Sequence, residues 1–571
     1  MSRSSQAIRA LVVVLGVSGS ALSVAAQGPT GTTAQPQLQT WPPRVGVEAG
    51  PEPLPLQRAI ELALANNPDI AVAGLDVAAA KQRTSAARGA YDVTLSSNNF
   101  FEHAVSPVAS IIGGGANGSL TQDNFTASAR TAGLTPWGGG SYQVDFSATR
   151  FESDNLFVTL NPQFPSVFRA SYVQPLGRGL SFDAPRRQIE ISRRTESLSL
   201  AVFRERALDV VARVEQAYWA LVYAQRNLDT QRQAVTQARS QVESNRRMAD
   251  AGVLAPIAVV EAETQALTFE QAAYSAQDAV TRAENTLKLV LLPDRSSPLW
   301  GRELHPVTPP AAPLGDWDVS EAVRQALANR PELARQDAAA AIADVDVRFF
   351  KDQARPQVDL VGTYAVAGLA GALISGGPNP ITAGTLVLQE RVNELSRSAG
   401  LGELPAPSTG APIQDFLIGG YGQSLQTLAQ ARFPTARVDV RFQLPLRNRT
   451  AEANLAVARI QREQVRSQRL QAEQAIEAEV RDAIQGVRSG RGRLAAGTAA
   501  RASAQEQYES ERRQFEAGTS TVFLVLQRQT ALVAAQARQI QAETDLETAM
   551  AFLRKALGEG LEYWNVLLLP D

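Results

Sequence analysis

The side chains that most often carry out catalysis or bind metals are scarce in this sequence. Cysteine is absent, and the histidines are His103 and His305, which stand far apart. Without cysteine there are no disulfides, thiol nucleophiles or Cys-ligated zinc. The run GGGANG at 113–118 has the glycine spacing of a dinucleotide-binding loop, but no helix pattern or suitably placed acidic residue follows it. We therefore expect a protein that is not an enzyme and that has no catalytic, cofactor-binding or metal site.

Composition points to long helices instead of several compact cores. The chain has 571 residues, of which 44% are hydrophobic but only 6% are aromatic. Lys and Arg number 55 and Asp and Glu 57, so the formal net charge is −2. A balanced charge does not favour a polyanionic partner, and we expect no nucleic acid to bind.

The N-terminus resembles an export signal. Arg3 and Arg9 precede the apolar run ALVVVLGV at 10–17, and small residues follow as far as Ala26. This order predicts a signal peptide over 1–26. No later run approaches the ~18 apolar residues of a membrane helix, so an exported chain of this kind is either soluble or inserts as a β-barrel. Because no cysteine follows the cleavage site, we expect no lipid anchor.

The sequence repeats itself over more than 200 residues. LPLQRAIELALANNPDI at 54–70 resembles WDVSEAVRQALANRPEL at 317–333, and AGVLAPIAVVEAET at 251–264 resembles AGTSTVFLVLQRQT at 517–530. This predicts two copies of one design. The expected divisions are a flexible linker at 27–53, a first repeat at 54–292, an inter-repeat linker at 293–316, a second repeat at 317–558 and a tail at 559–571.

Polar and apolar residues alternate in parts of both repeats. Val438, Val440 and Phe442 alternate with polar neighbours, and so do Val144 and Phe146. A period of two predicts strands with one apolar and one polar face. We place strands at about 91–176 in the first repeat and at about 356–366 and 435–445 in the second. A soluble β-sandwich would show the same alternation, whereas export favours a barrel with lipid outside and water inside. The candidate barrel-lumen residues are Gln143, Asp145, Arg437, Asp439 and Arg441.

Long helices follow the strands in each repeat. Helical hairpins are predicted at 185–292 and 450–558, and each rising helix of about 65 residues would measure about 100 Å. Apolar residues recur every seventh position, which predicts that each rising helix pairs with the returning helix in a left-handed supercoil. These residues are Val214, Leu221, Leu228, Val235 and Val242, then Val480, Val487 and Leu494, and on the returning helices Val253, Val260, Leu267 and Tyr274, then Leu526, Val533 and Ile540.

The ordered set of signal peptide, duplicated halves, two-faced strands and long hairpins resembles the TolC family of outer-membrane efflux proteins, which serve tripartite efflux and type I secretion systems. The resemblance covers about 54–558. It implies a mainly α protein whose coiled-coil helices form a periplasmic α-barrel, with β-strands of a trimeric outer-membrane β-barrel in a Gram-negative-type bacterium. It also implies a homotrimer embedded in outer-membrane lipid that exports substrates from an inner-membrane pump and a periplasmic adaptor (membrane fusion) protein.

The resemblance also implies roles for the ends of the hairpins. The turns between rising and returning helices become candidate adaptor-docking tips, namely Gly252, Val253, Leu254, Gly518, Thr519 and Ser520. The family has an acidic gate on the returning helix of the second repeat, where this chain has Leu524 and Gln527. An acidic ring therefore cannot be carried over to those two positions. Glu261 and Glu263 near the first tip are either ordinary surface charges of a helix or gate residues that threefold symmetry would repeat as rings. The candidate periplasmic gate comprises Glu261, Glu263, Leu524 and Gln527.

Two further features depart from the family pattern. The first repeat has four strand candidates where two are expected, so the extra pair either widens the barrel or forms a flap outside it. The segment 367–432 is a long insert between strands, which we interpret as an extracellular loop containing a helix near 385–398. An alternative function is a soluble periplasmic coiled-coil scaffold or adhesin without channel activity, in which the strands form a small sandwich.

Overall fold

The computed structural model describes residues 41–47, 49–109, 118–310, 316–374, 380–405 and 413–566. Residues up to Val45 form one unit, and Gly46–Asp571 form a second unit, which contains all the helices and strands. The predicted signal peptide, most of the 27–53 linker and most of the GGGANG run lie outside the described residues. Among those residues, no helix is both long enough and apolar enough to cross a membrane.

In each half of the chain, two consecutive helices lead into a strand of the large sheet. α1 (Leu56–Asn66) and α2 (Pro68–Arg88) are separated at Asn67, and α5 (Val319–Asn329) and α6 (Pro331–Gln353) at Arg330. The breaks lie at Pro68 and Pro331, as predicted, because proline has no N–H to continue a helix but fits at a first turn. The Asn67 side chain caps α2 by accepting from the N–H of Asp69 at 2.9 Å.

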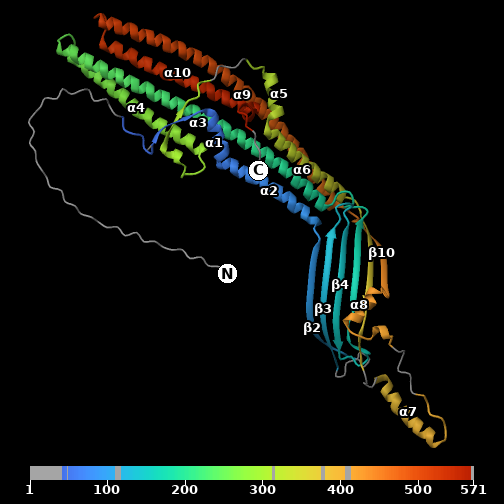
Figure 1. Cartoon of the computed structure of the whole chain (residues 1–571). Coiled ribbons are helices and arrows are strands. Elements are labelled where there is room, and N and C mark those ends of the chain that lie inside the picture. The colour runs from blue at the N-terminus through green and yellow to red at the C-terminus, as the bar shows by residue number, and fades with distance from the viewer. Residues whose placement is uncertain are drawn as a thin grey trace, which may run out of the picture. The chain divides into compact units, whose positions relative to one another are not determined.

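The longest helices form two antiparallel hairpins (Figure 1). α3 (Ala184–Asp250) contacts α4 (Pro256–Leu291), and α9 (Arg449–Glu516) contacts α10 (Val522–Leu557). These helices occupy the ranges in which long hairpins were predicted. At ~1.5 Å per residue, the 67 residues of α3 extend about 100 Å. A short helix, α11 (Gly560–Tyr563), follows α10.

The heptad residues of the rising helices are buried, but those of α4 are not. Val214 and Leu221 on α3 and Val480 and Val487 on α9 are fully buried. The predicted pairing residues of the returning helix are instead exposed: Val253, in the turn before α4, by 77%, and Val260, Leu267 and Tyr274 on α4 by 54%, 65% and 45%. α4 packs through small residues such as Ala262 and Ala273, which allow a close approach to α3. The prediction that these heptad residues of the returning helix pack against the rising helix α3 is therefore wrong.

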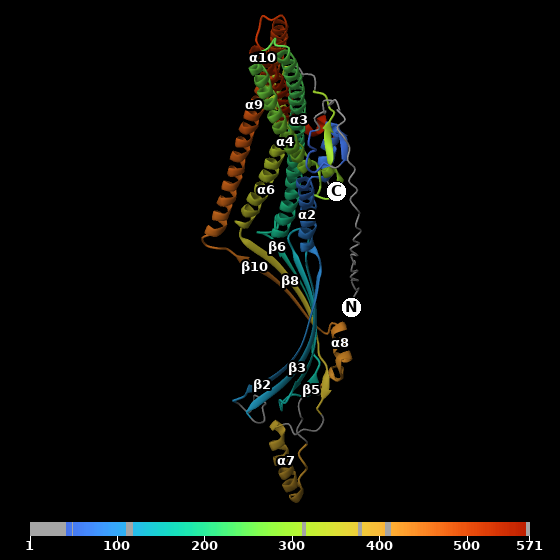
Figure 2. The same ribbon diagram turned by 90° about the vertical axis from the view of Figure 1, so that its left-hand side faces the viewer.

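The strands form one sheet, in the order β10-β8-β6-β4-β3-β2 (Figure 2). Neighbouring strands along this path are antiparallel. The strands are β2 (Thr94–Pro107), β3 (Ser119–Leu134), β4 (Ser141–Ser153), β6 (Ser166–Pro175), β8 (Gln357–Gly368) and β10 (Phe433–Gln443). Short β5 (Leu160–Gln163) pairs with β4 and with β9 (Gly371–Leu373).

All four strand candidates of the first repeat are present, and β2 and β3 extend the sheet beyond β4. The turn at 135–140 joins β3 to β4 as a hairpin, as predicted. The 367–432 insert contains β9, α7 (Pro380–Ser398) and α8 (Tyr421–Ala429). α8 lies against β6 and β8, where the hydroxyls of Ser424 and Ser166 are 2.8 Å apart and buried.

Two segments predicted as linkers contain strands. β1 (Ala49–Leu54) pairs in parallel with β7 (Arg302–Pro306), a segment that follows the short 3₁₀ helix η3 (Pro298–Gly301). The buried Tyr218 hydroxyl donates to the Leu54 carbonyl at 2.9 Å and ties this sheet to α3. Proline-rich sequence suggested flexibility, but β1 forms because a partner about 250 positions away supplies its ladder, and no local pattern encodes that partner.

Two apolar cores fill the helical part. One joins α1, α2, α3 and α4 with β1 and β7, and the other joins α5, α6, α9 and α10. A buried ion pair links α3 to α10, because Arg554 donates to Glu215 at 2.7 Å and the Trp564 indole N–H donates to the same oxygen at 2.9 Å. Burial raises the pKa of Glu215, and Arg554 and these hydrogen bonds oppose that rise.

Replacing Glu215 with Gln should destabilise the helical part. The change leaves the buried Arg554 without its counter-charge, and breaking a buried pair in this way costs about 3 kcal/mol or more. Thermal unfolding in detergent should show a lower midpoint. The matched control is Asp278→Asn on α4, because Asp278 pairs with Arg282 on an exposed surface. Equal midpoints for Glu215→Gln and the unmodified protein would contradict the structural role of this pair.

Candidate functional site

The sheet has one polar and one apolar face. Residues that face each other in an antiparallel ladder share a face, and the registers run from Gln143 through Ser171 and Thr363 to Arg437. The five candidate lumen residues therefore lie on one face, although they come from strands almost 300 positions apart. The structure brings together what the alternation predicted separately in each repeat.

Charged side chains on the polar face are paired with each other. Arg437 and Arg441 both donate through Nε to Asp439, at 2.8 and 3.3 Å, and the two arginine side chains are 72% and 65% exposed. Asp145 accepts from Arg130 Nε at 2.6 Å and from Gln143 Nε2 at 2.7 Å.

Two charged residues on this face were missed by the sequence analysis. Arg130 of β3 and Arg169 of β6 stand directly opposite Asp145 in the ladder. They line a groove of about 520 Å³ together with Asp145, Gln143 and serines of neighbouring strands. The period-two alternation of β3 also places Arg130 on the polar face. The prediction of lumen residues used the alternation of β4 and β10 alone and therefore missed it.

The opposite face is apolar and uncovered along β10. Val438, Val440 and Phe442 are 76%, 63% and 65% exposed. By register they share their face with Leu360 and Tyr364 of β8. Except for the region beneath α8, the sheet contacts no second layer in the described part of the chain.

The two hairpin tips lie next to each other. Ala258 and Ala262 of α4 form a buried cluster with Val522 and Leu526 of α10, and Leu254 packs against it. Gly252 and Gly518 have φ values of +75° and +76°, the left-handed conformation in which a helix commonly ends. Of the candidate docking residues, Gly252, Val253, Gly518 and Thr519 are exposed, whereas Leu254 and Ser520 are half-buried.

Two of the four candidate gate residues line a common groove, and the other two do not. Glu261 and Gln527 line a common groove of about 660 Å³ between α4 and α10, together with Val260 and Phe523. Glu263 points elsewhere, because it accepts from Arg246 of α3 at 2.6 Å, and Leu524 does not line the groove. Val260 and Phe523 were not among the candidate gate residues.

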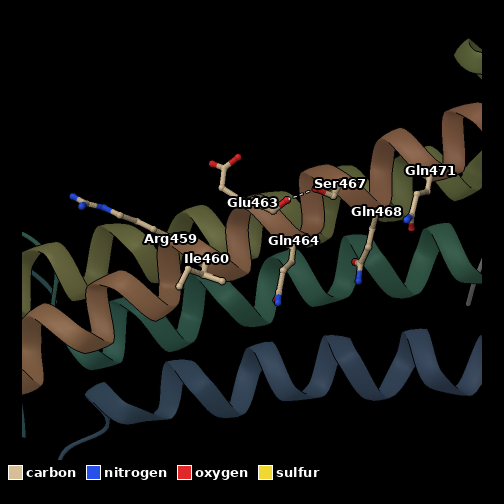
Figure 3. A pocket seen from close by; sticks show the side chains of 7 residues that line it. All are labelled: Arg459, Ile460, Glu463, Gln464, Ser467, Gln468 and Gln471. Carbon is tan, nitrogen blue, oxygen red and sulfur yellow. Dashed lines mark hydrogen bonds between the residues drawn. The ribbon is translucent and has the colours of Figure 1, made fainter.

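A third groove, of about 640 Å³, runs along the first half of α9 and is lined by that helix alone. Figure 3 shows Ile460, Gln464 and Gln468 on one side of α9, with Arg459 and Glu463 on the other. The groove marks an exposed face of α9, whereas Arg462 and Arg469 on another face of the same stretch pair with Asp344 and Asp337 of α6. It lies far along the helix from the tip.

Two parts of this chain match the sequence profile of a known family. The sequence profile of the outer membrane efflux protein family matches residues 180–291 and 418–559. No curated protein sequence matches the chain.

Solved structures of outer-membrane channels share the fold. The CmeC outer membrane channel of Campylobacter jejuni is 14% identical, with a TM-score of 0.59 and coverage of 88% of this chain and 86% of CmeC. The outer membrane protein VceC of Vibrio cholerae is 15% identical, with a TM-score of 0.56 and coverage of 88% and 96%. The open-state MtrE outer membrane channel of Neisseria gonorrhoeae is 15% identical, with a TM-score of 0.55 and coverage of 89% of each chain.

The fold is thus that of outer-membrane channel subunits, and the profile match falls on the long hairpins of both halves. The profile match and the shared fold together confirm the resemblance to the TolC-like family of outer membrane efflux proteins that the sequence shows.

Replacing Gly252 or Gly518 with Ala should loosen the corresponding tip. An added Cβ meets no atom within 4 Å at either position, so the effect is backbone strain of about 1 kcal/mol at positive φ. Limited proteolysis should cut the altered tip faster, with little change in global stability. The control is Gly492→Ala inside α9, also in open space, which should stabilise by about 0.5–1 kcal/mol. Unchanged cutting of both tip variants would contradict the strain argument.

Proposed function

We propose that this chain is one subunit of a homotrimeric outer-membrane channel through which substrates leave the cell. The observation that carries the proposal is the two-faced sheet, whose exposed apolar face suits lipid and whose polar face carries paired charges suited to a water-filled lumen. Membership of an efflux family and the fold of known outer-membrane channels support the same conclusion.

Assembly of several copies follows from the hydrogen bonds of the sheet. β2 and β10 are its two ends, so each has a row of backbone N–H and C=O groups without a ladder partner. In lipid each unsatisfied group costs several kcal/mol, and a single copy cannot close the ring. Three copies would close a barrel, and the exposed apolar residues Val260 and Leu267 on α4, with Val253 in the turn before it, would then have room to contact a neighbouring subunit.

The helical hairpins would extend the conduit across the periplasm. Their lengths of about 100 Å suit that span. We infer that the tips at Gly252 and Gly518 dock a periplasmic adaptor, since these residues are exposed and lie at the end opposite the sheet, and that an inner-membrane pump delivers the substrate. The similar element order of 54–292 and 317–558 is consistent with an internal duplication. We place the 367–432 insert outside the cell, because it follows the end of β8 that is farthest from the helices.

The alternative of a soluble scaffold or adhesin has less support. A sandwich would require a second layer on the apolar face, yet Val438 and Val440 are largely exposed. Nothing in the family assignment points to catalysis, and we propose transport without an enzymatic step.

Introducing a charge on the apolar face should prevent insertion. Val438→Arg places a cation near the middle of β10, where it would cost about 2–4 kcal/mol per copy at the bilayer midplane. The heat-modifiable trimer in outer-membrane fractions and the conductance of the purified protein in planar bilayers should both be lost. The control is Thr435→Arg on the polar face of the same strand, which should insert. Normal insertion of Val438→Arg would show that the faces are reversed, and a water-soluble monomer without conductance would refute the channel.

Removing the charge of Glu261 should change ion selection at the tip. Glu261 lines the α4–α10 groove, and threefold symmetry would repeat its charge around the passage. Glu261→Gln should reduce cation preference, measured as the reversal potential in a salt gradient. Glu263→Gln is the control and should have a smaller effect, because Glu263 is already paired with Arg246. An equal effect of both variants would contradict a gate at Glu261.

A further inference from the structure

The additional strand pair of the first half is a continuous part of the sheet. β2 pairs with β3 over its whole length, from Thr94 opposite Ala132 to Pro107 opposite Ser119. β3 pairs with β4 from Gln122 opposite Ser153 to Leu134 opposite Ser141. The edge of β4 that a neighbouring copy would need is therefore already occupied within the chain, and the free edge is β2.

We propose that β2 of one copy pairs with β10 of the next, so that the β2–β3 hairpin forms part of the barrel wall and each copy contributes six strands. This rests on the proposed trimeric channel. Three copies then give a barrel of about 18 strands, roughly 1.5 times as wide as one built from the two strands per repeat that the family resemblance implies. The occupant of each free edge is a second copy of this chain.

The two edges are suited to each other in direction and length. Strand directions alternate along the path from β2 to β10, so the edge strands of a six-stranded wall run in opposite directions and pair antiparallel when copies are placed side by side. β2 has 14 residues and β10 has 11. Both present apolar residues on the same face of the sheet, for example Phe101 at 67% and Val440 at 63% exposure.

The charges on the polar face are also complementary. β10 has two arginines, Arg437 and Arg441, and one carboxylate, Asp439, so this strand by itself has an excess of one positive charge. Asp359 of β8 stands opposite Arg441 in the ladder. β2 has Glu102 on the same polar face, as the ladder from Glu102 to Asn124 and Phe151 indicates. Pairing between copies would place this carboxylate on the strand next to the arginines.

The helices adjoining these strands have matching uncovered surfaces. α2 leads into β2, and β10 leads into α9. α2 packs on α3, α3 on α6 and α6 on α9, so α2 and α9 are the two ends of the helical layer just as β2 and β10 are the two ends of the sheet. Val72 and Leu75 of α2 are 58% and 69% exposed, and Ile460 and Leu470 of α9 are 58% and 60% exposed. One contact between copies would cover both helices and join both strands.

The widths of the two layers agree with six strands. Four helices at ~8–10 Å between axes span about 32–40 Å of circumference per copy. Six strands spaced ~4.8 Å apart and tilted by ~35–45° span about 35–40 Å, whereas four strands span about 25 Å. A six-stranded wall therefore continues the helical wall without a large step in diameter.

Disulfide trapping tests the pairing in the full-length chain, which has no native cysteine. Glu102→Cys is combined in turn with Arg437→Cys, Asp439→Cys or Arg441→Cys, so that successive registers are sampled, and outer membranes are oxidised. Within one copy the two strands lie at opposite ends of the sheet, so any bond joins two copies. We expect at least one combination to convert the monomer band into reducible dimer and trimer bands that neither single-cysteine variant produces.

The competing arrangement is tested with Asp145→Cys on β4 and the same β10 partners. If the β2–β3 hairpin lay outside the wall, β4 would meet the next copy and this set would crosslink instead, which would overturn the proposal. In the proposed wall the two positions are about three strand spacings, or ~14 Å, apart, beyond the reach of a disulfide. Failure of both sets in a protein that still forms a conducting trimer would also overturn it. If the unmodified protein forms no trimer and shows no conductance, the proposed channel itself is refuted.

Discussion

Backbone hydrogen bonding at the edges of the sheet is the constraint on which the rest of the molecule depends. A strand in lipid cannot leave its N–H and C=O groups to water, so in the proposed channel a sheet with free edges at β2 and β10 would be complete only when other copies supply partners. Helices satisfy these groups internally, which explains how α3 and α9 can extend so far beyond the sheet as long stems. In the proposed channel the strands would therefore require assembly, whereas the helices have their backbone groups satisfied with or without it.

Direct connections make the sheet and the stems behave as one wall. α2 leads into β2, α6 into β8, and β10 into α9, with only a few residues between them. The order of the helices from α2 to α9 is the same as the order of the strands from β2 to β10. In the proposed channel, a change in the number of strands per copy would therefore affect the whole conduit, because the circumference of the sheet would have to meet that of the helical layer.

Periodicity predicted the elements well but predicted partners poorly. The heptad residues Val214 and Val480 are buried as expected, yet Val260 and Leu267 of α4 are exposed. Seven-residue spacing shows that an apolar stripe needs a neighbour, but it does not show whether that neighbour is the next helix of the hairpin or another copy. The same limit applies to the predicted linkers, where β1 and β7 form because each finds the other across about 250 residues.

What the sequence alone determined is local: the breaks at Pro68 and Pro331, the extent of the hairpins and the alternation that separates Asp145 and Asp439 from their apolar neighbours. Each follows from a residue's effect on its own backbone or from a period of a few residues. Only the tertiary structure decided that Arg130 and Arg169 flank Asp145, that Glu261 shares a groove with Gln527 while Glu263 pairs with Arg246, and that β2 is an end of the sheet. These relations depend on register and packing between distant segments, which no short-range pattern encodes.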